Sequence, residues 1–163
     1  MRWIFLLLIS LNVWGVGFLQ PAEAFKPKIS LIDDNTVGVE IELGKNIYVY
    51  KDKLKVEDAN LNDGIDFASV SMAEAIDHEG EKVFENSPAI RIKLTKSADL
   101  IGPQTIGVKL SYQGCSSAGL CYEPMETALT IPVNADKLIS GDTVSSPLLK
   151  APAAKSVSAE AVA

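Results

Sequence analysis

Hydrophobic and polar side chains alternate with a period of two along four segments of the chain. Within each segment the apolar residues occupy every second position, as Val37, Val39 and Ile41 do around Gly38 and Glu40. This alternation is typical of β-strands that bury one face and expose the other to solvent. The segments predicted as strands on this basis are residues 36–43, 89–94, 105–113 and 127–133.

Shorter strands are expected at residues 47–50 and 54–56, and turn-forming Asp, Asn, Gly and Pro residues separate the segments. Only residues 71–76 hint at a helical turn, and no amphipathic helices lie between the strands. A parallel sheet of the thioredoxin type needs such helices as crossovers, so that fold is disfavoured. The pattern predicts an all-β protein with an immunoglobulin-like antiparallel β-sandwich.

The first 24 residues have the features of a secretory signal peptide. Arg2 precedes an apolar stretch, and Ala22-Glu23-Ala24 forms an A-x-A site, which predicts cleavage after Ala24. An uncleaved anchor is the alternative, but the apolar run is shorter than the ~20 residues that a spanning helix needs. We therefore expect export to an oxidising compartment, the bacterial periplasm or alternatively a eukaryotic secretory route, as a monomer outside the membrane.

The C-terminal end differs in composition from the strands. Residues 143–163 are mainly Ser, Ala, Pro, Val and Lys, with no aromatic residue and no strand alternation. Such a composition buries too little surface to offset the entropy lost on ordering, so we expect a flexible tail or linker. The folded domain is then predicted to span residues 25–142, which is enough chain for one hydrophobic core.

Charge and residue counts exclude several functions. Lys and Arg total 15 against 21 Asp and Glu, a formal net charge of −6. This balance argues against nucleic-acid or anionic-membrane binding, because both need concentrated positive charge. The two cysteines and the one histidine, His78, do not supply the four ligands of a zinc site, and the sequence has no cofactor-binding motif. Cu(I), which needs fewer soft ligands, stays open as a minor alternative.

The two cysteines, Cys115 and Cys121, form a C-x5-C loop between two predicted strands. Gly114 and Gly119 can adopt positive φ, so the loop can fold back and bring the sulfur atoms together. A disulfide across so short a segment removes only about 2.4 kcal/mol of unfolded-chain entropy, against about 4.7 kcal/mol for a loop of about 100 residues. The pair is a structural staple or a redox-active disulfide, and the spacing alone does not decide between them.

The loop and its flanks resemble the N-terminal periplasmic domain family of the thiol:disulfide interchange protein DsbD. The family pattern is close to Y-Q-G-C-x5-C-Y-x-P, and residues 46–51 resemble an aromatic Y-x-Y-[KR] strand of the same family. The resemblance extends over nearly the whole predicted domain, residues 25–133. The residues that match the loop pattern are Tyr112, Gln113, Gly114, Cys115, Cys121, Tyr122 and Pro124.

The resemblance implies an immunoglobulin-like domain that relays electrons by thiol–disulfide exchange and needs no cofactor. The electrons would come from a membrane-embedded thiol carrier of the DsbD type, or from its thioredoxin-like domain. They would pass to thioredoxin-like periplasmic proteins such as disulfide isomerases and the thioredoxins of cytochrome c maturation. The family's transmembrane and thioredoxin-like parts lie outside this sequence, so they would be separate chains or would have been cut away.

The resemblance also implies roles for individual residues. Cys121 would form mixed disulfides with partners, and Cys115 would be the resolving thiol. The family shields its cysteine pair with a cap loop that contains an aromatic residue. The corresponding region is residues 76–84, where His78 or Phe84 would take that place.

Three tyrosines, Tyr48, Tyr50 and Tyr122, are expected to surround the cysteine pair, although ordinary packing in the core explains them equally well. No Lys, Arg or His lies between Tyr112 and Glu126. Because nearby cations are what lowers the pKa of a thiol, we expect the reduced thiols to stay largely protonated until a partner docks. The alternative function is a secreted immunoglobulin-like binding module with a purely structural disulfide.

Overall fold

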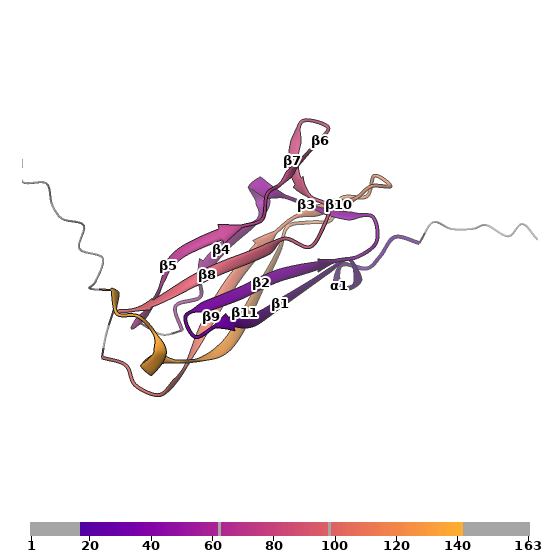
Figure 1. Cartoon of the computed structure of the whole chain (residues 1–163). Coiled ribbons are helices and arrows are strands. Elements are labelled where there is room, and N and C mark those ends of the chain that lie inside the picture. Colours follow the sequence, from indigo (N-terminus) through magenta and orange to yellow (C-terminus); the bar gives the residue numbers. More distant parts are fainter. Residues whose placement is uncertain (1–16, 62, 98, 142–163) are drawn as a thin grey trace, which may run out of the picture.

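The computed structural model describes residues 17–61, 63–97 and 99–141 (Figure 1). The predicted tail and most of the predicted signal peptide lie outside these residues. None of the helices in the described ranges is long and apolar enough to cross a membrane. The elements in chain order are α1 (Pro21–Ala24), β1 (Phe25–Asp33), β2 (Thr36–Leu43), β3 (Ile47–Tyr50), η1 (Lys51–Lys53), β4 (Lys55–Asp58), β5 (Ile65–Met72), β6 (Ile76–His78), β7 (Glu81–Phe84), β8 (Ala89–Lys96), β9 (Pro103–Tyr112), β10 (Gly114–Ser116), β11 (Met125–Asn134) and η2 (Ala135–Lys137).

These strands form three antiparallel sheets. One sheet has the strand order β1-β2-β8-β5 and a second has the order β11-β9-β4, and side chains from both meet in one hydrophobic cluster. The third sheet, β10-β3-β7-β6, is smaller and lies at one end of the molecule, where the β6–β7 hairpin projects (Figure 1). The predicted all-β, immunoglobulin-like antiparallel sandwich is confirmed.

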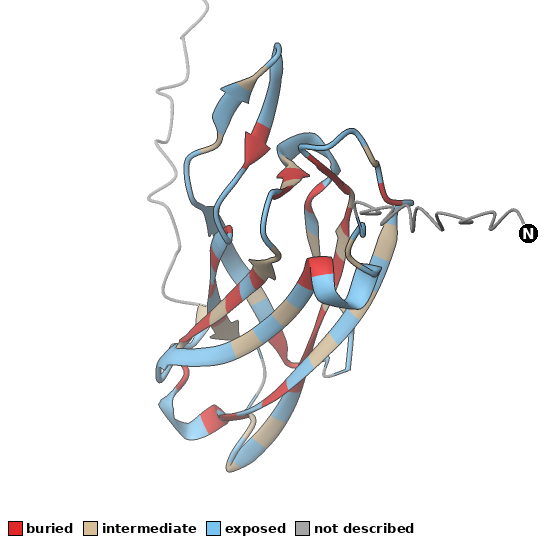
Figure 2. Ribbon diagram, turned by 90° about the vertical axis from the view of Figure 1, so that its right-hand side faces the viewer, coloured by how far each residue is buried: buried red, intermediate tan, exposed pale blue. Residues whose placement is uncertain are grey.

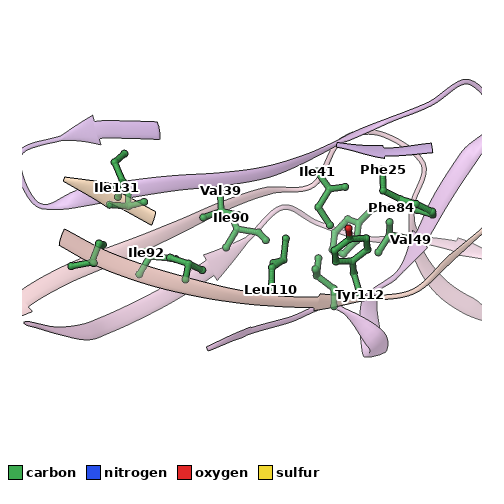
Figure 3. Close-up of a cluster of buried hydrophobic side chains, with 14 of the residues drawn as sticks. Phe25, Val39, Ile41, Val49, Phe84, Ile90, Ile92, Leu110, Tyr112 and Ile131 are labelled. Carbon is green, nitrogen blue, oxygen red and sulfur yellow. The ribbon is translucent and has the colours of Figure 1, made fainter. Parts of the chain in front are cut away.

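The core is built from the apolar side of the predicted strands. Along β8, exposed and buried residues alternate, as the period of two requires, and Figure 2 shows buried residues between more exposed ones along several strands. Figure 3 shows Phe25, Val49, Phe84 and Tyr112 gathered at one end of the cluster. Burying each such side chain stabilises the fold by about 1.5–3 kcal/mol. The branched aliphatic residues that are at most 1% exposed include Val37, Val39, Ile41, Ile90, Ile92, Val108 and Leu110.

The predicted strands agree closely with the observed ones. β2 has the predicted bounds, and β9 and β11 each begin two residues before the predicted start. The helical turn suggested at residues 71–76 is wrong, because β5 continues to Met72 and β6 begins at Ile76. The amide of Ala73 donates to the carbonyl of Ala89 at 3.0 Å, so pairing with the β8 side continues past β5. Pairing in the sheet outweighs the weak local preference.

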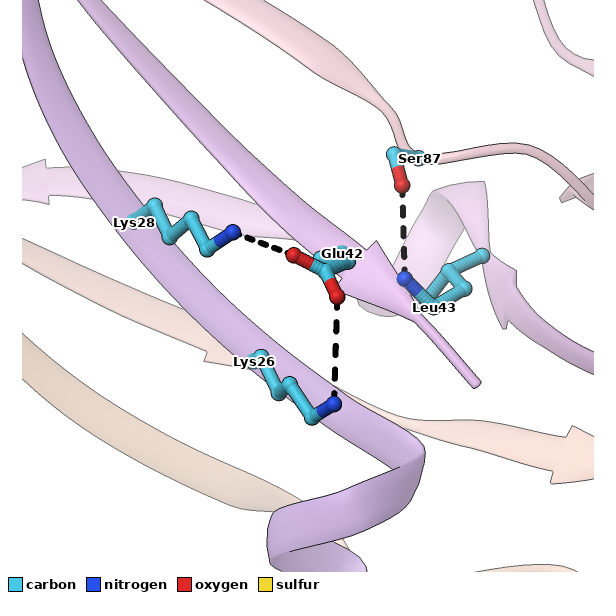
Figure 4. Close-up of polar contacts among 5 residues, drawn as sticks. All are labelled: Lys26, Lys28, Glu42, Leu43 and Ser87. Atoms are coloured by element: carbon cyan, nitrogen blue, oxygen red, sulfur yellow. Dashed lines mark hydrogen bonds and ion pairs between the residues drawn. The ribbon is translucent and has the colours of Figure 1, made fainter. Parts of the chain in front are cut away.

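Strand β1 was not predicted, because it is an edge strand with little burial over its second half. Its register with β2 is supported by charge, since Lys26 lies opposite Glu42 and both Lys26 and Lys28 form ion pairs with that carboxylate (Figure 4). The hydrogen bond and the charge of Lys28 hold the pKa of Glu42 below its usual value. Next to it, the amide of Leu43 donates to Ser87 Oγ at 3.3 Å.

Candidate redox site

A short hairpin that follows β9 carries the two cysteines. Its turn is closed by two hydrogen bonds, from the Ser116 amide to the Leu120 carbonyl (2.7 Å) and from the Gly119 amide to the Ser116 carbonyl (2.9 Å). On the returning arm the Tyr122 amide donates to the Gly114 carbonyl at 3.0 Å. The first arm is β10, which pairs with β3 and so attaches the hairpin to the small end sheet.

Cys115 and Cys121 lie opposite each other across this hairpin and are joined by a disulfide, with their Cα atoms 4.0 Å apart. Their environments differ. Cys115 belongs to β10 and is 1% exposed, whereas Cys121 lies on the returning arm and is exposed. A molecule that approaches this end of the domain therefore meets Cys121 before it meets Cys115.

The two glycines of the loop have different physical roles. Gly119 has a φ of +92° in the turn, as predicted. Gly114 does not have positive φ; it is a strand residue, and a Cβ at this position would fall on the carbonyl oxygen of Tyr48 and against the ring of Phe25. Gly114 is therefore required for close approach of the hairpin to β3.

Two of the predicted tyrosines, Tyr48 and Tyr50, lie on β3 beside the buried sulfur. The Tyr50 hydroxyl is 3.4 Å from Cys115 Sγ, within hydrogen-bonding distance for sulfur, and the Cα of Tyr48 is the register partner of Cys115. The two tyrosine rings pack edge to face, with centroids 5.5 Å apart. A hydrogen bond with Tyr50, followed by burial, raises the pKa of Tyr48 to about 12. The Tyr48 phenol is therefore neutral at physiological pH.

The third tyrosine, Tyr122, lies on the returning arm, and its side chain is buried in the core cluster. Its ring packs edge to face on Phe25 with centroids 5.1 Å apart, and its hydroxyl donates to the carbonyl of Leu19 at 2.8 Å. Burial, and the negative charge of Glu23, raise the pKa of Tyr122. Tyr122, which directly follows Cys121, thus connects the returning arm of the hairpin to the N-terminal segment of the domain.

The predicted cap region forms the β6–β7 hairpin. The His78 ring lies 4.9 Å from the Tyr48 ring, and His78 Nδ1 is 3.0 Å from a carboxylate oxygen of Glu85. Phe84 is 4% exposed and is paired with Val49 of β3, so it belongs to the core. Of the two aromatic residues considered for the cap, His78 is the one in contact with Tyr48.

The arrangement suits exchange at one sulfur. A thiolate that attacks the sulfur of the exposed residue, Cys121, forms a mixed disulfide, and the sulfur of the buried Cys115 leaves as a thiolate that stays nearby. Within residues 17–61, 63–97 and 99–141, no group of three or more His, Cys, Asp or Glu side chains could hold a metal ion.

Taken together, the fold and the hairpin define a small β-sandwich domain whose disulfide joins a buried and an exposed cysteine at one end. The sequence profile of the family described as "Thiol:disulfide interchange protein DsbD, N-terminal" matches residues 15–132. The chain belongs to this family.

Among its relatives, a thiol:disulfide interchange protein DsbD of Campylobacter jejuni is 29% identical over 124 residues, which cover 76% of this chain and 21% of the relative. The protein DsbD 1 of Pseudomonas aeruginosa is 32% identical over 117 residues, 68% of this chain and 18% of the relative. The chain therefore spans about a fifth of the length of these relatives. A solved complex of the DsbD and PilB N-terminal domains from Neisseria meningitidis matches with a TM-score of 0.53 and 26% identity, over 69% of this chain and 86% of the matched chain.

Sequence reasoning missed two residues of this end of the molecule. Glu85 pairs with His78 across seven positions, and Leu19 supplies the acceptor for Tyr122 across 103 positions. Neither residue has a neighbour in the sequence that signals the contact. Only the folded chain brings each pair together.

Proposed function

We propose that this chain is a thiol:disulfide oxidoreductase domain of the periplasm, which relays electrons to thioredoxin-like proteins through Cys115 and Cys121. The observation that carries the proposal is the unequal exposure of the two cysteines, 1% for Cys115 against an exposed Cys121. The family supports it, because the relatives are named thiol:disulfide interchange proteins. The structural neighbour from Neisseria meningitidis is a complex between the DsbD N-terminal domain and the PilB N-terminal domain.

The exchange starts from the dithiol form. The Cys121 thiolate attacks the disulfide of the partner, forming a mixed disulfide and releasing one partner thiolate. The Cys115 thiolate then attacks Cys121 Sγ, which forms the intramolecular disulfide and releases the second partner thiolate. The domain is oxidised by two electrons and the partner disulfide is reduced by two. A membrane thiol carrier of the DsbD type, or its thioredoxin-like domain, would regenerate the dithiol form.

The aromatic residues around the pair would control access and orientation. Tyr50 places its hydroxyl at 3.4 Å from Cys115 Sγ and would hold the resolving sulfur in position. Tyr48 and His78 stack beside it, and His78 would act as the aromatic cap of this domain. Tyr122 would hold the returning arm in place through its contacts with Leu19 and Phe25. These contacts would favour attack by a docked protein over attack by small oxidants.

Two single variants, Cys115→Ala and Cys121→Ala, test the assigned roles. Each is mixed with a thioredoxin that has a single active-site thiol activated as a 2-nitro-5-thiobenzoate disulfide, and adducts are separated on a non-reducing gel. Cys115→Ala is expected to form the covalent adduct, because its remaining thiol is exposed. Cys121→Ala is expected to form little, because its remaining thiol is buried. An adduct with Cys121→Ala alone would reverse the roles.

The wild-type disulfide distinguishes this function from a secreted binding module with a fixed disulfide. Equilibration with a thioredoxin couple, whose potential is about −270 mV, should give measurable amounts of both redox forms. No exchange, together with a potential below about −300 mV, would support the binding module instead.

A further inference from the structure

The segment just before β1 is packed into the domain. Ala24 is fully buried, and its carbonyl accepts a hydrogen bond from the amide of Gly44 at 2.8 Å. Leu19 packs against the hydrophobic cluster, and a Cβ at Gly44 would collide with the Leu19 side chain and crowd the backbone of Glu23 and Ala24. The β2–β3 turn thus has a glycine where this segment lies against it.

The same segment contacts the redox hairpin. The carbonyl of Leu19 accepts the hydrogen bond of the Tyr122 hydroxyl at 2.8 Å, and Tyr122 directly follows the exposed Cys121. The carboxylate of Glu23 is near enough to influence that phenol. Phe25 lies between Tyr112 and Tyr122, with ring centroids at 5.6 Å and 5.1 Å.

Cleavage after Ala24 would remove these contacts. The Phe25 nitrogen, whose N–H donates to the carbonyl of Pro21, would become a charged chain end without that partner. The Gly44 amide would lose its acceptor at Ala24, and the Tyr122 hydroxyl would lose its acceptor at Leu19, at a cost for each lost hydrogen bond. The fold therefore disfavours a mature chain that begins at Phe25.

The sequence offers a second processing site upstream. Gly15 and Gly17 place small residues at the −3 and −1 positions of a cleavage site that follows the apolar stretch. We propose that the signal peptide ends at Gly17. Residues 18–24, here called the clasp, would then remain on the exported protein and position Tyr122 and the disulfide hairpin. The proposed cleavage position does not depend on the proposed function, whereas the effect on thiol–disulfide exchange rests on it.

The first test is the mass of the exported protein. The full chain is expressed in a Gram-negative host, and the periplasmic form is measured by intact mass spectrometry. A chain that begins at Phe18 supports the proposal. A chain that begins at Phe25, or one that still carries Met1, overturns it. This measurement needs no redox partner, so its outcome is separate from that of the exchange experiments.

The second test removes the clasp contact alone. Tyr122→Phe deletes the hydroxyl but keeps the ring, and the matched control Tyr112→Phe deletes a hydroxyl that lies 3.5 Å from Thr127 Oγ1 instead. With the chain that begins at Phe18, Tyr122→Phe is expected to speed reduction of the disulfide by dithiothreitol about fivefold, the effect of one lost hydrogen bond on local opening. The control should stay within about twofold of the wild type on the same scale. Equal rates for the two variants overturn the positioning role.

Discussion

The two arms of the redox hairpin hold the two ends of one disulfide in opposite environments. The arm of Cys115 is β10, whose three residues are all buried and paired with β3. The arm of Cys121 follows a turn whose residues 117–119 are exposed, and Cys121 itself is exposed. The flanking sequences are alike, since each cysteine has a glycine one or two residues before it and a tyrosine within three residues. The difference therefore comes from what each arm packs against.

This comparison shows that one end of the disulfide is attached to the sandwich while the other end lies at the surface. The buried arm is paired with β3, and under the proposed roles this pairing would hold the Cys115 sulfur in position when the bond opens. On the other arm, Cys121 and turn residues 117–119 are exposed, whereas Tyr122 directly after Cys121 belongs to the core cluster. Of the two cysteines, only Cys121 thus lies outside the packed part of the domain.

The largest expected effect comes from a methyl group on the buried arm. In Gly114→Ala the new Cβ meets the Tyr48 carbonyl and the Phe25 ring, and we expect a loss of about 3 kcal/mol in the free energy of unfolding. In the matched variant Gly119→Ala, the new Cβ has no atom within 4 Å and only the positive φ is strained, which should cost about 1 kcal/mol. Urea denaturation measures both. Equal losses would show that the two arms are packed alike.

The next effect is on thiol reactivity in the reduced protein. We expect iodoacetamide to modify Cys121 on the order of 30-fold faster than Cys115, because a buried thiol needs a local opening that costs about 2 kcal/mol. Mass spectrometry of quenched samples gives the two rates. Both rates should still rise through about pH 8, because the hairpin has no cation to lower the thiol pKa values. Similar rates for the two cysteines, or a plateau already reached at about pH 7, would contradict this picture.

A smaller effect is expected from the hydroxyl beside the buried sulfur. Tyr50→Phe removes the contact at 3.4 Å from Cys115 Sγ, and should slow closure of the mixed disulfide about fivefold, the effect of one hydrogen bond. Stopped-flow exchange with the activated thioredoxin measures this step. Tyr48→Phe is the control, because its hydroxyl has no contact of this kind with the sulfur. If the control slows closure as much, the effect belongs to the aromatic cluster as a whole.

The last effect concerns alkaline pH. Because the pKa of Tyr48 is raised from 10.0 to about 12, its neutral form is favoured in the folded state. The stabilisation it provides is complete below pH 10.0 and is lost as the pH rises toward about 12. Tyr48→Phe should therefore lose less stability than the wild type between those two pH values, as measured by urea denaturation. An equal loss would show that Tyr48 does not titrate in this range.

Much of the fold could be predicted from local sequence. The alternation of Val37, Val39 and Ile41 with polar neighbours predicts β2 with its observed bounds, because a strand with one buried face requires that period. Strands without this pattern, such as β1 and β5, were not predicted, since edge strands have little burial and their pairing depends on a neighbouring strand.

The candidate site also has some features that are visible in the local sequence and others that depend on tertiary packing. The C-x5-C loop with its glycines and tyrosines is visible in the sequence, and so is a family pattern that predicts exchange chemistry. The hydroxyl of Tyr50 reaches the sulfur of Cys115 across 65 positions, and that contact has no local signal. The role of Gly114 was also misassigned, because close approach to Tyr48 is a property of strand pairing.

The sequence by itself determined that this chain is a β-sandwich with one cysteine pair on a short loop, because strand periodicity and cysteine spacing are local properties. Only the tertiary structure decided that Cys115 is buried and Cys121 is exposed, and that Tyr122 is held by Leu19. Burial depends on which distant segments pack against a residue. That packing exists only after β3, the β6–β7 hairpin and the N-terminal segment have assembled around the loop.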